Sequence, residues 1–504
     1  MKAKKIIAVL LALTLFFITG CKGGNKNPQG SSGENGTDST TFTLLYCSND
    51  TFNPYTLKTK VNMELCQLLY DSLVVLDNGF SPVYKLAECA VQSGNVWTVT
   101  LKNAVFSDNS PVKSEDVIYS FNLAKANVTY SSSLSHVSSV NAEGSKVIFT
   151  LSSNDPFFVN LLNFPIIKSG SDNIRNEDSV LLPPIGAGRY VLNDTKTAIQ
   201  KNANYYGAAP KWASISLVDA PDSESVAHYV EVGATDLYYA SAGDSDIFRM
   251  DGKKFSINQN RLVYLGVNLS NPTLNNIKVR YGISAAINRE KIVSTAYYGN
   301  AVAANGPFSP FFKETLGYQT IETSSNNKIA IENLEQIGYN ILDNVGVRKN
   351  ANGNSLSFSL LINKDNPSHT LAANLIKSQL SEAGIKISVK ALSYSAYISA
   401  LKSGSFQLYL AEVKINNNFD ISPLVTPGGN CAYGMTASNT DAGLTDIMNK
   451  YKSGQASVSD VITAVGSQMP FIPLCYRSGM IFYSENLGDV NDASADDLFK
   501  FTQN

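Results

Sequence analysis

The residue types that commonly carry out catalysis are sparse in this chain and are not spaced for it. The 504 residues include three histidines, His136, His228 and His369, whose separations match no metal-ligand motif. The sequence contains no GxSxG elbow, no HExxH helix and no glycine-rich phosphate loop. It therefore predicts neither an enzyme nor a resident metal or cofactor, and it directs attention to side chains that could bind a ligand.

Cys21 is the residue with the clearest signal for modification. It follows a positively charged start at residues 1–5, an apolar run at residues 6–18 and two small residues. The apolar run is too short to cross a bilayer, so residues 1–20 are interpreted as a secretory signal peptide. The small residues before Cys21 resemble the lipobox of bacterial lipoproteins, which implies lipidation of Cys21 and attachment to the outer face of the cell membrane. The alternative is an ordinary signal peptide with a cysteine nearby.

The composition after the signal predicts a flexible tether and then a globular protein. Residues 21–41 are rich in Gly, Asn and Ser and lack apolar periodicity, as is typical of a flexible segment. About 460 residues remain, enough for two or three lobes. The net charge is −2 with both signs interspersed, which argues against a nucleic-acid partner. The remaining cysteines have no CxxC spacing and are interpreted as small buried side chains rather than a disulfide framework: Cys47, Cys66, Cys89, Cys431 and Cys475.

Residues 356–413 predict a parallel sheet. Alternation and helical periodicity give, in order, a strand at 356–360, a helix opened by Asn366 and Pro367, a strand at 385–391, a helix at 394–402 and a strand at 406–413. Short β-α-β connections require parallel strands with right-handed crossovers. Ligands of open α/β sheets bind beyond the carboxyl ends of the strands, so the loops after Ile362 and Val413 are candidate binding loops.

Two further regions have clear helix signals. A helix at 115–126, with Ser114 as its expected cap, lies between strands at 97–101 and 147–151. A helical stretch at 277–298 is expected to break at Asn288, which can cap a second helix.

Four segments, taken together, resemble a known family. They are LYDSL at 69–73, WTVTLKNAVFSD at 97–108, GAGRY at 186–190 and VRYGISAAINREKIV at 279–293. Their order, behind a lipobox-like start, resembles the solute-binding lipoproteins of ABC importers in the oligopeptide, dipeptide and nickel class. The chain departs from that family's usual residues in three places, with Asn109 for Gly, Arg189 for Pro and Asn288 for Asp.

The resemblance implies an α/β fold of the type II periplasmic-binding-protein kind, with two lobes around a central cleft and a hinge near residues 263–267 and 471–474. It also implies an extra domain inserted in the first lobe. The expected boundaries are 42–74 plus 179–262 plus 475–504 for the first lobe, 75–178 for the inserted domain and 263–474 for the second lobe.

The loop at residues 412–423 is the expected ligand loop. In peptide-binding relatives an Asp in this region anchors the ligand's ammonium, and here Asn416 or Asn417 stands near that position. A desolvated ammonium needs an opposite charge, so Glu412 and Asp420 are the candidate anchors. The alternatives are an internal salt bridge for Glu412 and a bond to its own loop for Asp420. The parallel-sheet argument places the same loop at a strand's carboxyl end.

Three other residues are candidate ligand contacts by resemblance. Tyr433 follows the ligand loop and suits either the cleft or the core. Thr56 and Lys58 occupy the family's other ligand edge, although an exposed Lys58 is also expected of an ordinary surface lysine.

The resemblance implies a monomeric, lipid-anchored component that captures a peptide or similar small solute and delivers it to permease and ATPase subunits of an importer. Two alternatives stay open at this point. One is a surface receptor for a signalling peptide. The other is a binder of a chelated metal or haem, because three scattered histidines argue only against a directly ligated ion.

Overall fold

The computed structural model describes residues 41–242 and 250–503. Cys21, the signal peptide and tether residues 21–40 lie outside these ranges. Within them, no helix has both the length and the apolar character needed to cross a membrane.

The predicted first lobe is built on a four-stranded sheet. Its order is β1 (Thr43–Tyr46), β10 (Ser214–Asp219), β9 (Ala198–Lys201) and β8 (Tyr190–Leu192). Helix α1 (Lys60–Leu69) buries Leu65 and Leu68 in the same core as Leu44 and Ile215. Helix α3 (Ser223–Glu231) follows β10 along the chain.

The predicted inserted domain contains a second, antiparallel sheet. Its order is β4 (Ala87–Ser93), β5 (Val96–Leu101), β7 (Lys146–Leu151) and β6 (Val137–Glu143), with α2 (Ser114–Ala126) packed against it through Val117 and Phe121. The two expected strands and the helix are confirmed. The expected cap is wrong, because Lys113 occupies the N-cap and the Oγ of Ser114 instead donates to the carbonyl of Gly144 at 2.8 Å.

The largest sheet carries the predicted parallel unit. Its order is β11 (Leu237–Ala240), β19 (Phe471–Tyr483), β12 (Lys253–Val267), β18 (Leu408–Lys414), β16 (Ser357–Asn363) and β17 (Lys386–Leu392), with β13 (Ala301–Ala303) paired to β19. Strand β16 runs parallel to both β17 and β18, and α8 (Pro367–Glu382) and α9 (Tyr394–Lys402) connect them. The side chain of Asn366 caps α8 by accepting from His369 N–H at 3.2 Å. The β-α-β-α-β prediction is therefore confirmed.

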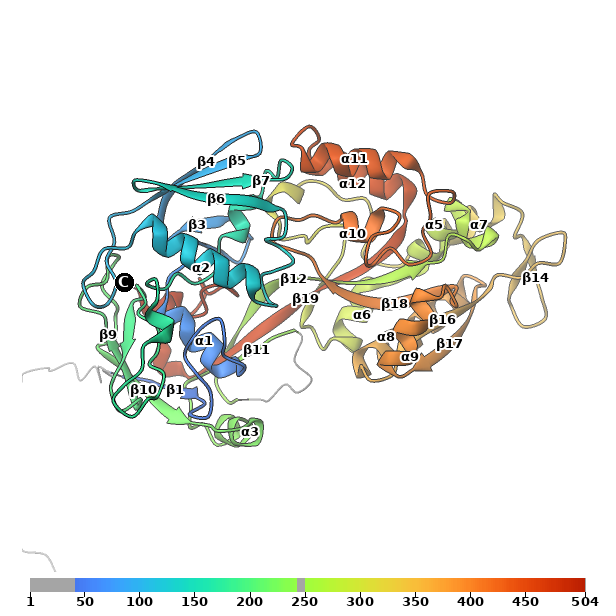
Figure 1. Cartoon of the computed structure of the whole chain (residues 1–504). Helices are drawn as coiled ribbons and strands as arrows, with labels where there is room; N and C mark the ends of the chain where they lie inside the picture. Colours follow the sequence, from blue (N-terminus) through green and yellow to red (C-terminus); the bar gives the residue numbers. More distant parts are fainter. Residues whose placement is uncertain (1–40, 243–249, 504) are drawn as a thin grey trace, which may run out of the picture. The chain divides into compact units, whose positions relative to one another are not determined.

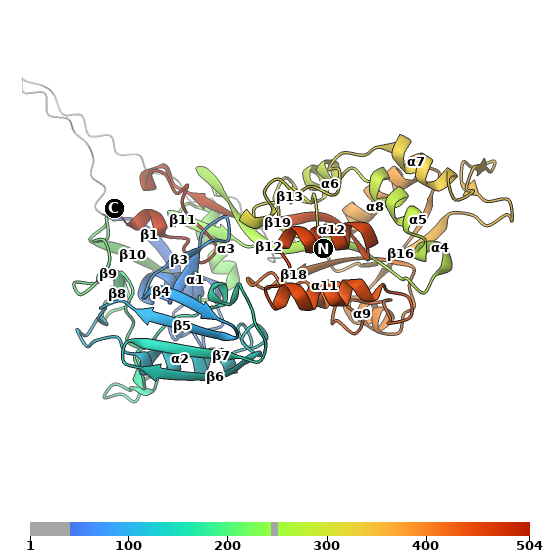
Figure 2. The same cartoon turned by 90° about the horizontal axis from the view of Figure 1, so that it is seen from above.

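Helices cover this sheet on the second-lobe side. They are α4 (Pro272–Asn275), α5 (Ile277–Ala286), α6 (Arg289–Ala296), α7 (Asn327–Glu335), α10 (Ser422–Val425), α11 (Ala442–Lys452) and α12 (Val458–Gln468). The break at Asn288 is confirmed, since its side chain accepts from Lys291 N–H and caps α6. Helices α11 and α12 lie side by side (Figure 2), and their Leu444 and Ile462 share one core with Tyr264 of β12.

Strands β12 and β19 connect the two regions. They have 15 and 13 residues, pair antiparallel, and run from the part of the fold that holds β11 to the part that holds β18 (Figure 1). Their ladder is interrupted between Asn258 and Leu262, where the register shifts. A β-bulge bends a strand locally. The predicted hinge segments, 263–267 and 471–474, lie within these two strands, and the hinge role stays a prediction.

The short remaining elements connect these parts. They are the hairpins β2 (Val74–Leu76) with β3 (Pro82–Tyr84) and β14 (Ile341–Leu342) with β15 (Arg348–Lys349), and the 3-10 turns Phe158–Leu161, Ser171–Asn173, Lys313–Thr315, Glu485–Leu487 and Lys500–Thr502. The five cysteines of the described ranges are free thiols, and Cys47, Cys66 and Cys475 are buried.

A buried charge network joins the end of the chain to the first lobe. Arg189, of which 1% is exposed, forms an ion pair with Asp497, and Lys85 Nζ lies 2.9 Å from the other oxygen of the same carboxylate. Burial alone would raise the pKa of Asp497, but the charges of Arg189 and Lys85 outweigh burial and hold this pKa below its ordinary value. The network therefore binds three segments that are far apart in sequence.

Candidate functional site

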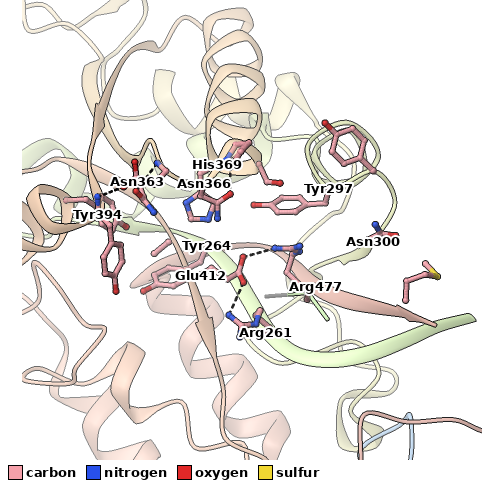
Figure 3. Close-up of a pocket in the computed structure, with 18 of the residues that line it drawn as sticks. Arg261, Tyr264, Tyr297, Asn300, Asn363, Asn366, His369, Tyr394, Glu412 and Arg477 are labelled. Carbon is pink, nitrogen blue, oxygen red and sulfur yellow. Dashed lines mark hydrogen bonds and ion pairs between the residues drawn. The ribbon is translucent and has the colours of Figure 1, made fainter. Parts of the chain in front are cut away.

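A cavity of about 1420 Å³ lies beside β12, β18 and β19 of the largest sheet. Side chains from β12, β18 and β19 line it, together with the first turn of α8 and residues of α9. Small-molecule pockets usually measure about 300–1,000 Å³, so this cleft has room for a ligand of several residues. Figure 3 shows its polar wall.

A three-residue ion cluster lies in this wall. Glu412 of β18 accepts a hydrogen bond from Arg261 of β12 through Oε1 and from Arg477 of β19 through Oε2, each at 3.0 Å (Figure 3). The Glu412 and Arg477 side chains are 11% and 10% exposed, and that of Arg261 is 30% exposed. Because Arg261 belongs to β12 and Arg477 to β19, the one carboxylate on β18 joins side chains from three strands of the same sheet. We call these three residues the ion triad.

Buried polar groups surround the ion triad. The Arg477 guanidinium lies 4.8 Å from the ring centre of Tyr297, and His369 stands in the first turn of α8. The two ring nitrogens of His369, the Tyr297 hydroxyl and Arg477 Nε are buried without hydrogen-bond partners. Burial, together with the charge of Arg477, lowers the pKa of His369 to about 4, although Glu412 opposes the shift. His369 is therefore neutral at pH 7.

Tyrosines form much of the remaining wall. Six of them line the cleft: Tyr264, Tyr297, Tyr298, Tyr394, Tyr397 and Tyr433. Tyrosine offers a large, stiff contact surface with a polar tip, which suits ligand binding. Tyr433 also packs edge-to-face on the buried Tyr409, with ring centres 6.0 Å apart, so it serves both the cleft and the core.

The residues expected in the ligand loop, and Tyr433 after it, separate into two places. Glu412 and Tyr433 line the large cleft, whereas Asn416 and Asp420 line a second cavity of about 170 Å³. One oxygen of Asp420 accepts from the backbone N–H of Ser422 at 2.9 Å and from its hydroxyl. Asp420 thus bonds to its own loop, which was the alternative to a ligand anchor at this position.

The tip of the loop contacts residues of the predicted inserted domain. Asn160 Nδ2 donates to the carbonyl of Asn417 at 3.1 Å, and Asn418 Nδ2 donates to Asp155 at 2.8 Å. Phe157 packs its ring against Phe419, with centres 6.1 Å apart. These contacts join the loop to the inserted domain in this structure.

Thr56 and Lys58 lie in neither of these two cavities. Both are exposed, and their backbone N–H groups donate to Asn53 O at 3.1 Å and to Asp50 at 2.8 Å. Their role at a ligand edge stays a prediction.

Sequence reasoning missed Arg261, Arg477, Tyr297 and His369. The two arginines are 216 residues apart by numbering and share no motif, so only the pairing of β12 with β19 brings them together. A usable signal existed for His369, because it stands in the first turn of the helix that follows the candidate loop after Ile362. Within the described ranges, no group of three or more His, Cys, Asp or Glu side chains could hold a metal ion.

Comparison with known proteins places the chain in one family. The family model described as bacterial extracellular solute-binding proteins, family 5, middle part, matches residues 81–432. The oligopeptide-binding protein AppA of Bacillus subtilis is 23% identical over 440 residues, which are 79% of this chain and 78% of AppA. The nickel-binding periplasmic protein of Escherichia coli is 22% identical over 485 residues, covering 87% and 89%.

Solved structures give the same fold. A nickel ABC transporter protein from Bacillus halodurans superposes with a TM-score of 0.72 at 20% identity, covering 88% of this chain and 95% of that one. The periplasmic murein tripeptide binding protein MppA, in an unliganded open form, gives a TM-score of 0.69 at 17% identity, covering 88% and 93%.

The chain belongs to family 5 of the bacterial extracellular solute-binding proteins. This confirms the resemblance seen in the sequence and the type II two-lobed α/β fold. It also confirms the predicted class of function, which is the solute-binding component of an ABC importer.

Proposed function

We propose that this protein captures a peptide or a similar small solute in the cleft that contains the ion triad, and passes it to the permease and ATPase subunits of its importer. The observation that carries the proposal is the 1420 Å³ cleft, lined by tyrosines and by charges of both signs. A peptide has two charged ends and a polar backbone, and such a lining offers partners to each. The protein acts as a monomer and catalyses no reaction on its solute.

The names of the relatives favour a peptide as the solute, and they also include a solute that is not a peptide. One is named for oligopeptides, one is a peptide transport protein of Haemophilus influenzae, and one is named for nickel. Among the expected ligand contacts, Glu412 of the ligand loop and Tyr433 after it line this cleft. We therefore assign them, with Arg261 and Arg477, to the ligand-binding surface.

Titration calorimetry with a defined pool of di- to pentapeptides tests this proposal. Ala411 of β18 lines the cleft, so the indole of Ala411→Trp should obstruct part of it and weaken binding at least tenfold. Ala142→Trp, on an exposed position of β6, is the matched control and should bind like the parent. Saturating ligand should also stabilise the parent, by about 2.7 kcal/mol at a hundredfold excess over Kd. Equal binding by the parent and Ala411→Trp would contradict the assignment of the cleft.

We further propose that lipid on Cys21 holds the protein on the outer face of the cell membrane. The support is the lipobox-like sequence before Cys21 and the Gly- and Ser-rich residues that follow it. Cys21→Ala should remove the protein from the membrane fraction. A variant that sediments with membranes as strongly as the parent would show that the attachment is elsewhere.

A further inference from the structure

The ion triad carries one uncompensated positive charge. Glu412 supplies a single negative charge to two guanidiniums, and Arg477 is nine-tenths buried. The other charged residues that line the cleft are Asp251, Lys254 and Asp365, and the Asp365 carboxylate accepts from Tyr394 N–H at 2.8 Å. A buried charge is stable only when it is paired, so a ligand anion beside Arg477 would complete the pairing of the triad.

The two guanidiniums also have unused hydrogen-bond donors. Each arginine side chain has five N–H donors in a planar fork that matches a carboxylate. The side-chain hydrogen bonds of Arg261 and Arg477 in the described structure are the two that reach Glu412. Arg477 Nε is buried without a partner. A carboxylate, which accepts through two oxygens, fits these unused donors.

A helix N-terminus faces the same part of the cleft. Helix α8 has 16 residues, and its first turn, from Asn366 to His369, lines the same cavity as the ion triad (Figure 3). The N-terminus of a helix carries a partial positive charge and attracts anions. His369 adds an N–H donor there without a formal charge. Two independent features thus make one wall of the cleft positive.

We propose that this wall receives an oxyanion of the ligand, a carboxylate such as the C-terminus of a short peptide, on Arg261 and Arg477. Glu412 then acts as the internal counter-ion that positions both guanidiniums, and it does not anchor the ligand's ammonium. This inference rests on the proposed function. With the ligand bound, two carboxylates face two guanidiniums, and the charge of the site is balanced.

Glu412→Gln separates the two roles of the carboxylate. If Glu412 anchored an ammonium, its loss would weaken a free-amine peptide at least tenfold. As a counter-ion, its loss leaves two unpaired guanidiniums, so the ligand carboxylate gains a partner and binding becomes tighter. We expect Glu412→Gln to bind the free-acid peptide pool at least threefold more tightly than the parent does.

The experiment measures Kd by calorimetry for a pool of di- to pentapeptides with free C-termini and for the same pool with C-terminal amides. The parent should bind the amides at least tenfold more weakly. Arg477→Met, which keeps length and removes charge, should lose most of this difference. Arg175→Met, at an exposed arginine outside the cleft, is the control and should match the parent.

Several outcomes would overturn the inference. They are equal affinity of the parent for acids and amides, unchanged discrimination in Arg477→Met, or weaker binding of the free acids by Glu412→Gln. Binding of neither pool would overturn it too. In that last case, nickel–histidine complexes and glutathione are added to the parent and to Ala411→Trp. Their binding shows whether only the carboxylate inference fails or the proposed function of the cleft fails as well. A solute that binds only the parent keeps the cleft as the capture site, and no binding at all removes the proposed function as well.

Discussion

Replacing Asp497 with asparagine is expected to lower the free energy of unfolding by about 3–5 kcal/mol, because it leaves two buried cations without their shared anion. Asp497 is 2% exposed and pairs with both Arg189 and Lys85. Urea denaturation at pH 7, compared with the parent, measures the loss. Asp489→Asn is the control, since Asp489 is exposed and close in sequence, and it should change stability little. Similar losses in the two variants would contradict the assigned role of the network.

The pH dependence of this effect has a definite sign. The pKa of Asp497 is below its ordinary value in the folded protein, so its stabilisation is complete above the unfolded value, about 3.9, and is lost as the pH falls through the folded value. The difference between the parent and Asp497→Asn should therefore be constant from pH 7 to about pH 5. It should shrink only in stronger acid.

Acidification from pH 6.5 to pH 4 is expected to destabilise the protein through His369 by up to about 3 kcal/mol. The pKa of His369 is about 4 when folded, against about 6.5 for an ordinary histidine. The unfolded chain therefore binds a proton over this range, while the folded protein does not. Full stability is present above the unfolded value and falls as the pH is lowered toward the folded value.

His369→Leu should remove this part of the acid sensitivity. Leucine has no ring nitrogens to leave unpartnered, so the variant should be at least as stable as the parent at pH 7. Urea unfolding at half-unit steps from pH 7 to pH 4 gives the comparison, with His228→Leu as the control because His228 is exposed. Parallel pH curves for the parent and His369→Leu would contradict the buried, neutral state of this histidine.

Local sequence signals predicted most of the elements that position the site. Asn366, Asn288 and the alternating residues after Gly384 placed helices and strands close to where the structure has them. Asn109, which stands where the family usually has Gly, adopts φ of +66°, a left-handed conformation that asparagine tolerates better than most residues. These features depend on neighbours a few residues away, which the sequence displays directly.

Partnerships between distant residues could not be predicted in the same way. The sequence around Arg189 did not predict that this side chain is buried, because its partner Asp497 is more than 300 residues away. Glu412 was expected in the binding region, but its two arginine partners depend on which strands become neighbours in the large sheet. The role of Asp420 was left open between a ligand anchor and a loop bond, and the structure shows the loop bond.

Native mass spectrometry of protein purified from its own host tests the central claim most directly. The claim is that the cleft with the ion triad holds the transported solute. We expect a bound small molecule on the parent and on Ala142→Trp, and its loss from Ala411→Trp, whose added ring obstructs the cleft. The same bound molecule retained at equal occupancy by Ala411→Trp would contradict the account, because the solute would then lie elsewhere.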